Sequence, residues 1–203
     1  MINKQWGQRC FVVMALFTGL LTAGCEQRGQ DARMGEFGTL NAAKDFTLKD
    51  QDGKVFHLKD HRDQLVLLFF GYLSCPDICP MTLSKVTKAM NLLGKPWKGK
   101  ILTVFVSIDT NRDTSAKLKE YLSYFNIESV GLTGTKEEVD AVVNAYKASY
   151  QRVETDSVMG YLFDHSDYLY LIDHQGTVRY LFRMEDKAEH VAETIKRLSN
   201  SAR

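Results

Sequence analysis

Apolar residues recur with two different periods along the chain, and their alternation predicts the order of its elements. Two short apolar runs, at 65–70 and 101–108, are typical of strands buried on both faces of a sheet. Apolar residues at helical spacing follow each run, over 80–93 and 115–125, and Gly94-Lys95-Pro96 is expected to end the first of these helices. This strand–helix–strand–helix order predicts an α/β domain with a mixed sheet flanked by helices.

Turn residues divide the flanking segments into two hairpins. Asp52-Gly53 separates the apolar segments 46–48 and 55–58, and Asp-Gly is a strong hairpin signal. A second turn separates strands at 168–172 and 177–182. The remaining predicted elements are a strand at 130–132, a helix that Thr135 and Glu138 begin with a capping box, and an amphipathic helix over 187–198. The first hairpin is an addition at the N-terminal side of the α/β core.

Two cysteines follow the first buried strand, each directly before a proline. The residue before a proline is pushed out of the helical region, so we expect Cys75 and Cys79 to be extended. Proline is well tolerated at the first helical position, so Pro80 is expected to begin the helix and Cys79 to cap it. The partial positive charge of a helix N-terminus favours thiolate over thiol. The pair can therefore form a disulfide or bind a soft metal.

The N-terminal residues are predicted to be a targeting signal. Positive residues precede an apolar stretch at 11–21, which is too short to span a membrane. The sequence Leu-Thr-Ala-Gly-Cys that ends at Cys25 is similar to a bacterial lipoprotein motif, although Thr22 stands where leucine is commoner. A simple signal peptide and a short anchor are the alternatives.

The lipoprotein interpretation sets the domain organisation and the location. It predicts a signal peptide over 1–24, a polar tether over 25–40 and one domain over 41–203. The protein is then exported and lipid-anchored through Cys25 to a bacterial membrane, and it faces the periplasm or the cell exterior. A net charge of +1 gives no nucleic-acid footprint, so no nucleic-acid partner is expected.

Processing at Cys25 leaves Cys75 and Cys79 as the remaining thiols, because Cys10 lies in the signal. In an exported protein such a pair is either a disulfide or a metal site. A structural disulfide would close a very short loop and would constrain the unfolded chain little. A functional role for the pair is therefore preferred.

His165 is the candidate for a third functional residue, because it directly precedes the strand at 168–172. The element order resembles that of the thioredoxin fold, in which this connection lies against the cysteines and carries a cis-proline. All three prolines of the chain lie before residue 97, so the usual disulfide-exchange geometry is missing. Two thiolates and one imidazole suit Cu(I), and Cu(II) tolerably, whereas structural zinc would want a fourth ligand. Met81 and Met159 are soft neighbours, but helical core packing explains Met81 better.

Three blocks of sequence resemble the Sco/SenC family of copper-binding assembly proteins. Residues 70–80 (FGYLSCPDICP) are similar to its signature, residues 106–114 (VSIDTNRDT) to its second block, and residues 164–173 (DHSDYLYLID) to its third. The resemblance spans about 46–198. It implies a thioredoxin-like fold, copper bound by Cys75, Cys79 and His165, and help in building the copper centre of cytochrome c oxidase. Asp77 and Asp109 also match family positions, where turn and cap chemistry is the simpler explanation.

Two functions are compatible with this resemblance. The first is a copper metallochaperone, not an enzyme that turns over a substrate, whose partner is the copper-site subunit of cytochrome c oxidase. The alternative is a membrane-anchored thiol-disulfide reductase that uses Cys75 and Cys79 to keep the target's copper-ligating cysteines reduced. Another copper carrier or a thiol reductant would be a further partner. A peroxiredoxin-like peroxidase is disfavoured, since Pro76 stands where that family places a threonine.

Overall fold

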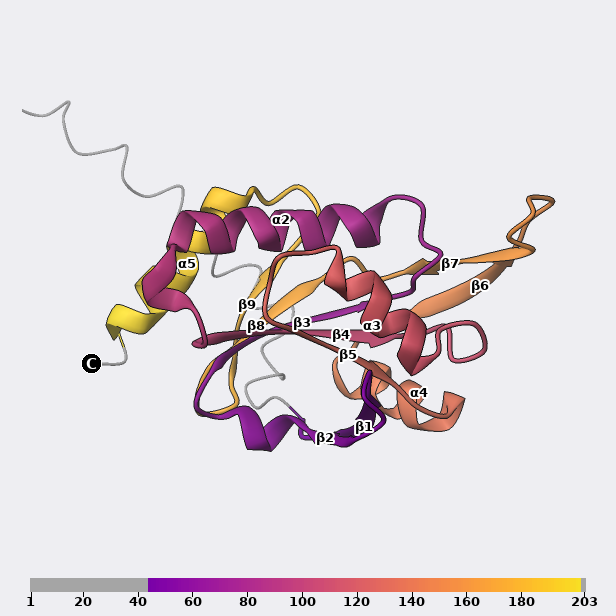
Figure 1. Cartoon of the computed structure of the whole chain (residues 1–203), viewed down its shortest axis with the longest axis horizontal. Coiled ribbons are helices and arrows are strands. Elements are labelled where there is room, and N and C mark those ends of the chain that lie inside the picture. The colour runs from indigo at the N-terminus through magenta and orange to yellow at the C-terminus, as the bar shows by residue number, and fades with distance from the viewer. Residues whose placement is uncertain (1–43, 202–203) are drawn as a thin grey trace, which may run out of the picture. The chain divides into compact units, whose positions relative to one another are not determined.

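The computed structural model describes residues 44–201, which form a mixed α/β fold (Figure 1). The main sheet has seven strands in the order β2-β1-β5-β4-β3-β8-β9. Its strands are β1 (Thr47–Asp50), β2 (Val55–His57), β3 (Leu65–Gly71), β4 (Ile101–Ser107), β5 (Ser129–Thr133), β8 (Leu169–Ile172) and β9 (Val178–Phe182). The helices are α2 (Ile78–Leu93), α3 (Ser115–Ser123), α4 (Lys136–Ala145) and α5 (Ala188–Ser201), with short 3-10 turns η1 (Leu58–His61) and η2 (Lys95–Trp97).

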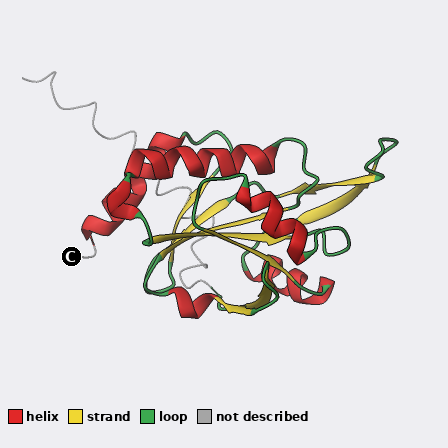
Figure 2. Cartoon of the chain, viewed as in Figure 1, coloured by secondary structure: helices red, strands yellow, loops and turns green. Residues whose placement is uncertain are grey.

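The core forms around β3 and β4, in which every residue is buried. These two strands run parallel, while β8 pairs with β3 in the antiparallel direction. Helices cover the sheet on both sides, with α2 and α5 together on one side and α4 on the other (Figures 1 and 2). Burial on both faces explains why these strands are continuously apolar rather than alternating. The mixed sheet, its flanking helices and the added hairpin of β1 and β2 are confirmed.

Local signals fix the ends of two helices as the sequence predicts. Thr135 caps α4, and Glu138 completes the capping box by accepting a hydrogen bond from the Thr135 backbone. Gly94 ends α2 with a φ of 76°, a left-handed conformation that favours glycine. These ends need no tertiary contact to be read from the sequence.

The sequence analysis misses one hairpin. Strands β6 (Tyr150–Glu154) and β7 (Tyr161–His165) form a separate two-stranded sheet that projects from the main one (Figure 1). Most of the β6 side chains are exposed and those of β7 are half-buried, so no alternation of apolar and polar residues marks these strands. His165 is therefore the last residue of a strand, rather than part of the connection before the strand at 168–172.

The start of α2 also differs from the prediction. The helix begins at Ile78 with Asp77 as its N-cap, so Cys79 lies inside the first turn and is helical rather than an extended cap. The first four N–H groups of a helix have no intrahelical partner, so proline is tolerated at the third helical position as well as the first. Tertiary packing of Cys79 overrides the extended preference of a residue before proline.

Met81 is likewise not a core residue. Its side chain is 50% exposed, while the buried face of α2 is formed by Cys79, Thr82, Leu83, Val86, Ala89 and Leu93. Met81 lies on the other side of the helix, which explains the error. In the part of the chain that the structure describes, no helix is long and apolar enough to cross a membrane. The predicted signal, the tether and Cys25 lie outside the described residues.

Candidate metal centre

The structure brings together the three side chains that the sequence analysis proposes as ligands. Cys75 lies in the loop after β3, Cys79 in the first turn of α2, and His165 at the end of β7. Their donor atoms all lie within 4.8 Å of one another, and Cys79 Sγ is 3.6 Å from His165 Nε2. Both cysteines are free thiols. Segments far apart in the sequence thus converge on one small volume.

The two thiols differ in exposure. Cys79 is 0% exposed, whereas Cys75 is half-buried and reaches the surface. Gly71 permits the burial of Cys79, because a Cβ at this position would lie 2.7 Å from Cys79 Sγ and 2.9 Å from the ring of Phe69. Only a glycine leaves room for the sulfur here. One sulfur is therefore accessible to a partner, and the other is held inside the protein.

His165 is held with its free nitrogen toward the cysteines. Its Nδ1 lies 2.9 Å from the carbonyl oxygen of Ser166, which can only accept, so Nδ1 carries the proton. Nε2, on the side of Cys79, is then the unprotonated nitrogen. The rings of Phe69 and Tyr72 contact the imidazole edge-on, with centroids 6.1 Å and 5.7 Å away. This is the arrangement in which a histidine offers a lone pair to a metal.

Electrostatics divide one proton unequally between the two cysteines. A hydrogen bond from the Cys79 thiol lowers the pKa of Cys75 well below its ordinary value, and hydrogen bonds from the backbone N–H groups of Asp77 and Cys79 add to this effect. Burial raises the pKa of Cys79, and the hydrogen bond and charge of Cys75 raise it further. At neutral pH the pair is therefore a Cys75 thiolate beside a Cys79 thiol.

A buried carboxyl group anchors the loop that carries Cys75. Asp113 accepts hydrogen bonds from the Leu73 backbone at 2.9 Å and from Ser107 Oγ at 2.6 Å. Burial raises the pKa of this carboxyl group. The sequence analysis does not single out Asp113, because nothing near it in the chain shows that it reaches back to the cysteine loop.

A second polar cluster, which we call the hairpin latch, consists of Asp109, Arg112 and Tyr161. Asp109 accepts hydrogen bonds from Arg112 Nε and, at 3.0 Å, from the Tyr161 hydroxyl. Arg112 Nη1 donates to the backbone oxygens of Met159 and Tyr161 at 2.9 Å and 3.1 Å. The guanidinium also lies 3.6 Å from the centroid of the Tyr161 ring. The latch fastens the hairpin that carries His165 to the connection between β4 and α3.

The latch gives Asp109 more than the turn role that the sequence suggests. Its carboxylate is buried and holds a second element, which no local motif reveals. Asp77, by contrast, is an exposed N-cap residue of α2 whose side chain makes no capping hydrogen bond. Among the soft neighbours considered, Met159 contributes its backbone oxygen to the latch, and its side chain is 39% exposed.

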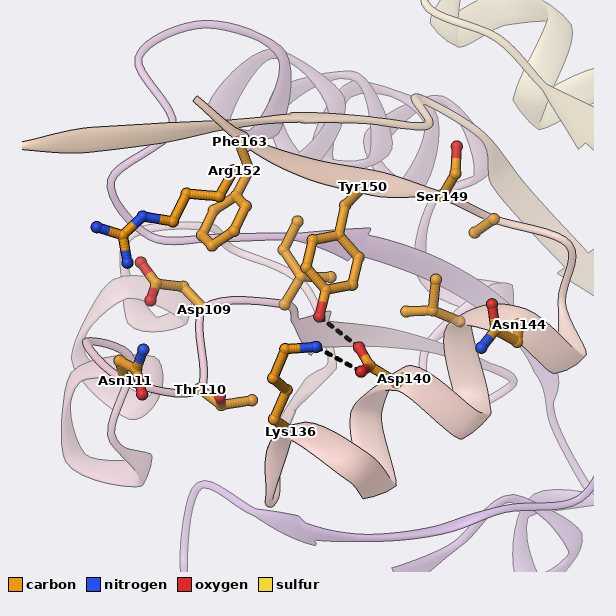
Figure 3. A pocket seen from close by; sticks show the side chains of 13 residues that line it. Asp109, Thr110, Asn111, Lys136, Asp140, Asn144, Ser149, Tyr150, Arg152 and Phe163 are labelled. Atoms are coloured by element: carbon orange, nitrogen blue, oxygen red, sulfur yellow. Dashed lines mark hydrogen bonds and ion pairs between the residues drawn. The ribbon is translucent and has the colours of Figure 1, made fainter. Parts of the chain in front are cut away.

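A pocket of about 530 Å³ lies beside the hairpin and contains none of the three converging donors (Figure 3). Its charged groups are paired: Lys136 and the Tyr150 hydroxyl both bind Asp140, and Arg152 binds Glu154 at 2.8 Å. Asp109, the remaining charged residue of the lining, binds Arg112, so each charged group of this pocket already has a partner. The chemistry of the domain is concentrated at the cysteines and His165.

The donor set decides what this site can hold. Two sulfurs and one imidazole nitrogen are soft to intermediate donors, which fit Cu(I) and other thiophilic ions better than Mg²⁺ or Ca²⁺. No cis peptide bond occurs in residues 44–201, so the cis-proline of thioredoxins has no counterpart there. The fold and site together define an α/β protein with a Cys-Cys-His site for a soft metal at its first buried strand–helix junction.

Comparison with known proteins identifies the family. The sequence model of the SCO1/SenC family matches residues 36–200. The chain is 40% identical to a SCO2-like protein of Rickettsia felis over 153 residues, which cover 75% of this chain and 74% of that one. The chain therefore belongs to the SCO1/SenC family.

Solved structures agree with this assignment. Copper-bound ScoI of Arabidopsis thaliana has a TM-score of 0.73 at 28% identity, over 79% of this chain and 99% of that one. Copper-bound ScoI of Bradyrhizobium japonicum has a TM-score of 0.69 at 33% identity, over 77% and 98% of the two chains. Yeast Sco1 with copper bound gives 0.71 at 31% identity, over 79% and 90%. The likeness confirms the thioredoxin-like fold.

Proposed function

We propose that this protein is a copper metallochaperone that binds copper through Cys75, Cys79 and His165 and delivers it to the copper-site subunit of cytochrome c oxidase. The observation that carries the proposal is the convergence of three soft donors with the free imidazole nitrogen directed at them. The copper-bound relatives of similar structure support copper as the cargo.

The unequal thiols suit uptake and release of a cargo ion. Cys75 is already a thiolate and half-exposed, so it is the first sulfur that incoming Cu(I) meets. Cys79 must lose its proton before both sulfurs bind, so uptake releases a proton. For release, a thiolate of the target can replace the accessible Cys75 while Cys79 and His165 still hold the ion. The buried sulfur thereby keeps the ion bound until the target's ligands have engaged.

A second candidate function is a thiol-disulfide reductase, which the stabilised and accessible Cys75 thiolate also supports. The Cys75 thiolate would attack one sulfur of a target disulfide and displace the other as a thiolate. Cys79, after losing its proton, would attack the Cys75 sulfur of this mixed disulfide and release the target as a dithiol. The protein would end as a Cys75–Cys79 disulfide, which a thiol reductant must reduce again.

The variant His165→Ala separates the two functions, because it removes one donor and leaves the cysteines in place. Loss of a hydrogen bond to a metal ligand lowers metal affinity about 10- to 100-fold. Copper delivery predicts that removal of a ligand itself lowers Cu(I) affinity by more than this, and that oxidase activity in cells is lost. The dithiol–disulfide couple should still cycle. His174→Ala is the matched control, since His174 is an exposed turn residue.

The assays are a competition titration of Cu(I) and an oxidase-activity measurement in cells. Normal oxidase assembly by His165→Ala protein that no longer binds copper would refute delivery and support the reductase. We also propose that lipid at Cys25 holds the domain at a bacterial membrane on the side away from the cytoplasm. Uptake of labelled lipid by the wild type, but not by Cys25→Ser, tests this anchor.

A further inference from the structure

A cluster of lysines lies at the end of the domain opposite the metal centre. Between Asp77 and Asp109 the sequence contains five lysines and no acidic residue, although the whole chain has a net charge of only +1. Three of these lysines, Lys95, Lys98 and Lys100, lie within and just after η2, and all three are exposed. We call them, together with Leu92 and Trp97, the basic end. The excess of positive charge in this segment is therefore larger than the excess in the chain as a whole.

The three lysines are available to an outside partner. No ion pair within residues 44–201 involves any of them. The one acidic residue on the neighbouring groove is Glu128, whose carboxylate already accepts a hydrogen bond from Gln64 at 3.1 Å. The other acidic residue nearby is the exposed Asp63, which lies two residues before Leu65, the partner of the Lys100 carbonyl. Neither carboxylate forms an ion pair with the three lysines, so an excess of positive charge remains at this end.

Apolar side chains lie among these lysines. Leu92 is 50% exposed at the end of α2, and Trp97 is half-buried in η2. Trp97 also borders an open groove whose apolar wall includes Met90, Ile101 and Ile127. A tryptophan surrounded by lysines is typical of surfaces at a membrane interface, where the indole lies at headgroup level and the ammonium groups meet lipid phosphates.

We propose that the basic end docks on a bilayer that contains anionic phospholipid. This occupant is favoured over an acidic protein because exposed leucine and tryptophan accompany the charge, and because the proposed lipid at Cys25, on which this inference partly rests, holds the domain beside a membrane. Each lysine near an anionic surface strengthens docking about fivefold, so three lysines contribute about a hundredfold.

Docking at this end fixes where the metal centre points. Lys100 directly precedes β4, and the cysteines lie beyond the other end of β3, which runs parallel to β4. The seven residues of β4 span about 23 Å at ~3.3 Å per residue. The sixteen residues of α2, from the cysteines to Leu93, span about 24 Å at ~1.5 Å per residue. Docking therefore holds the metal centre roughly 20 Å off the bilayer and directs it away from the lipid, toward a partner domain that stands above the membrane.

The test uses Trp97 as its own probe in the full chain. Trp6 lies in the predicted signal peptide, which processing at Cys25 removes, so Trp97 is the tryptophan that remains in the lipidated protein. This protein is purified from bacterial membranes and reconstituted into phosphatidylethanolamine vesicles with or without phosphatidylglycerol, carrying brominated acyl chains. Vesicle flotation first reports whether the anchor holds. Quenching of Trp97 emission by bromine then reports docking, and neither readout involves copper.

We expect quenching and a blue shift of Trp97 in vesicles with phosphatidylglycerol, and reversal in 1 M salt, where the Debye length falls to about 3 Å. The triple variant Lys95→Gln, Lys98→Gln, Lys100→Gln should float normally but lower the ratio of docked to undocked protein about a hundredfold. The charge-matched control replaces Lys49, Lys54 and Lys59, which are exposed on and beside the β1–β2 hairpin, and should dock as the wild type does.

Two outcomes would overturn the proposal. Equal Trp97 quenching with and without phosphatidylglycerol would mean that the lysines do not recognise anionic lipid. Absence of quenching in floating protein, combined with loss of oxidase activity in cells carrying the triple variant, would assign the basic end to an acidic protein partner instead. Failure to float would count against the anchor at Cys25 and therefore against docking as proposed here, whereas it would leave the copper chemistry of the domain untouched.

Discussion

Gly71 offers a direct test of how closely the metal centre depends on backbone packing. A Cβ added by Gly71→Ala would lie 2.7 Å from Cys79 Sγ, whereas ordinary contacts of this kind are about 3.5–4.0 Å. The sulfur must therefore move by about 1 Å, or the backbone must shift by a similar distance. The added ring contacts, at 2.9 Å to Phe69 and 3.0 Å to Phe105, leave little space for such a shift.

The expected magnitudes follow from this overlap. Overpacking of a tight core costs about 1–3 kcal/mol of unfolding free energy. Cys79 is a proposed copper ligand, and changes just outside a metal's ligands already lower affinity about 10- to 100-fold. Displacement of the Cys79 sulfur should therefore lower Cu(I) affinity by at least this factor. The affinity is measured by competition titration on the reduced protein, and stability by denaturant unfolding of the metal-free protein.

Gly131→Ala is the matched control. Its Cβ would lie 2.7 Å from a methyl carbon of Leu122 and 3.1 Å from Leu118, so the overlap is the same but lies away from the cysteines. Both variants should lose stability, and only Gly71→Ala should lose copper affinity. Equal losses of affinity in the two variants would show that general destabilisation explains the effect. Unchanged affinity in Gly71→Ala would refute the close packing of Gly71 on Cys79.

Two further predictions concern the latch and the shared proton. Arg112→Ala removes the donors to the hairpin backbone, so it should lower Cu(I) affinity about 10- to 100-fold and change the His165 NMR signal in the metal-free protein. The control Arg179→Ala, on an exposed face of β9, should change neither the affinity nor the signal. The lowered pKa of Cys75 predicts that the rate of its reaction with iodoacetamide stays nearly constant from pH 8 to pH 6. Cys79→Ala removes the main hydrogen bond to Cys75, so in this variant the rate should fall as the pH is lowered. A rate that falls tenfold per pH unit in the wild type would contradict the shared proton. Because the pKa of Cys79 is raised, this thiol must lose its proton for both sulfurs to bind, so Cu(I) affinity should rise about tenfold per unit of pH as pH increases through neutrality, and an affinity independent of pH would contradict this assignment.

The sequence by itself determined the elements whose signals are local. The continuous apolar runs predicted β3 and β4, because strands buried on both faces have no polar side. Thr135 with Glu138 predicted the start of α4, and Gly94 predicted the end of α2, because these signals act within one helical turn. The cysteine pair at a strand–helix junction was also visible, since both residues lie within one short segment.

The start of α2 and the β6–β7 hairpin needed the tertiary structure. Local rules placed Cys79 before the helix, whereas its burial against Gly71 draws it into the first turn. No residue of the two hairpin strands is fully buried, and contacts of Arg112 with the hairpin backbone, together with packing of Phe163 on Tyr72, hold it in place. Patterns of hydrophobicity detect buried faces and cannot detect an element that is fixed by polar contacts.

The sequence predicted which residues form the candidate site, and the fold determined how they are arranged. His165 stood out in the sequence through its place before a strand and its family resemblance, but its distance to Cys79 and its support by the latch come from segments more than fifty residues away. Its tautomer is fixed by the neighbouring Ser166 carbonyl in the folded backbone. Which cysteine is the thiolate is likewise a tertiary property, because burial and a mutual hydrogen bond set the two pKa values in opposite directions. The chain encodes the donors locally, and long-range packing decides how they face one another and which of them meets a partner.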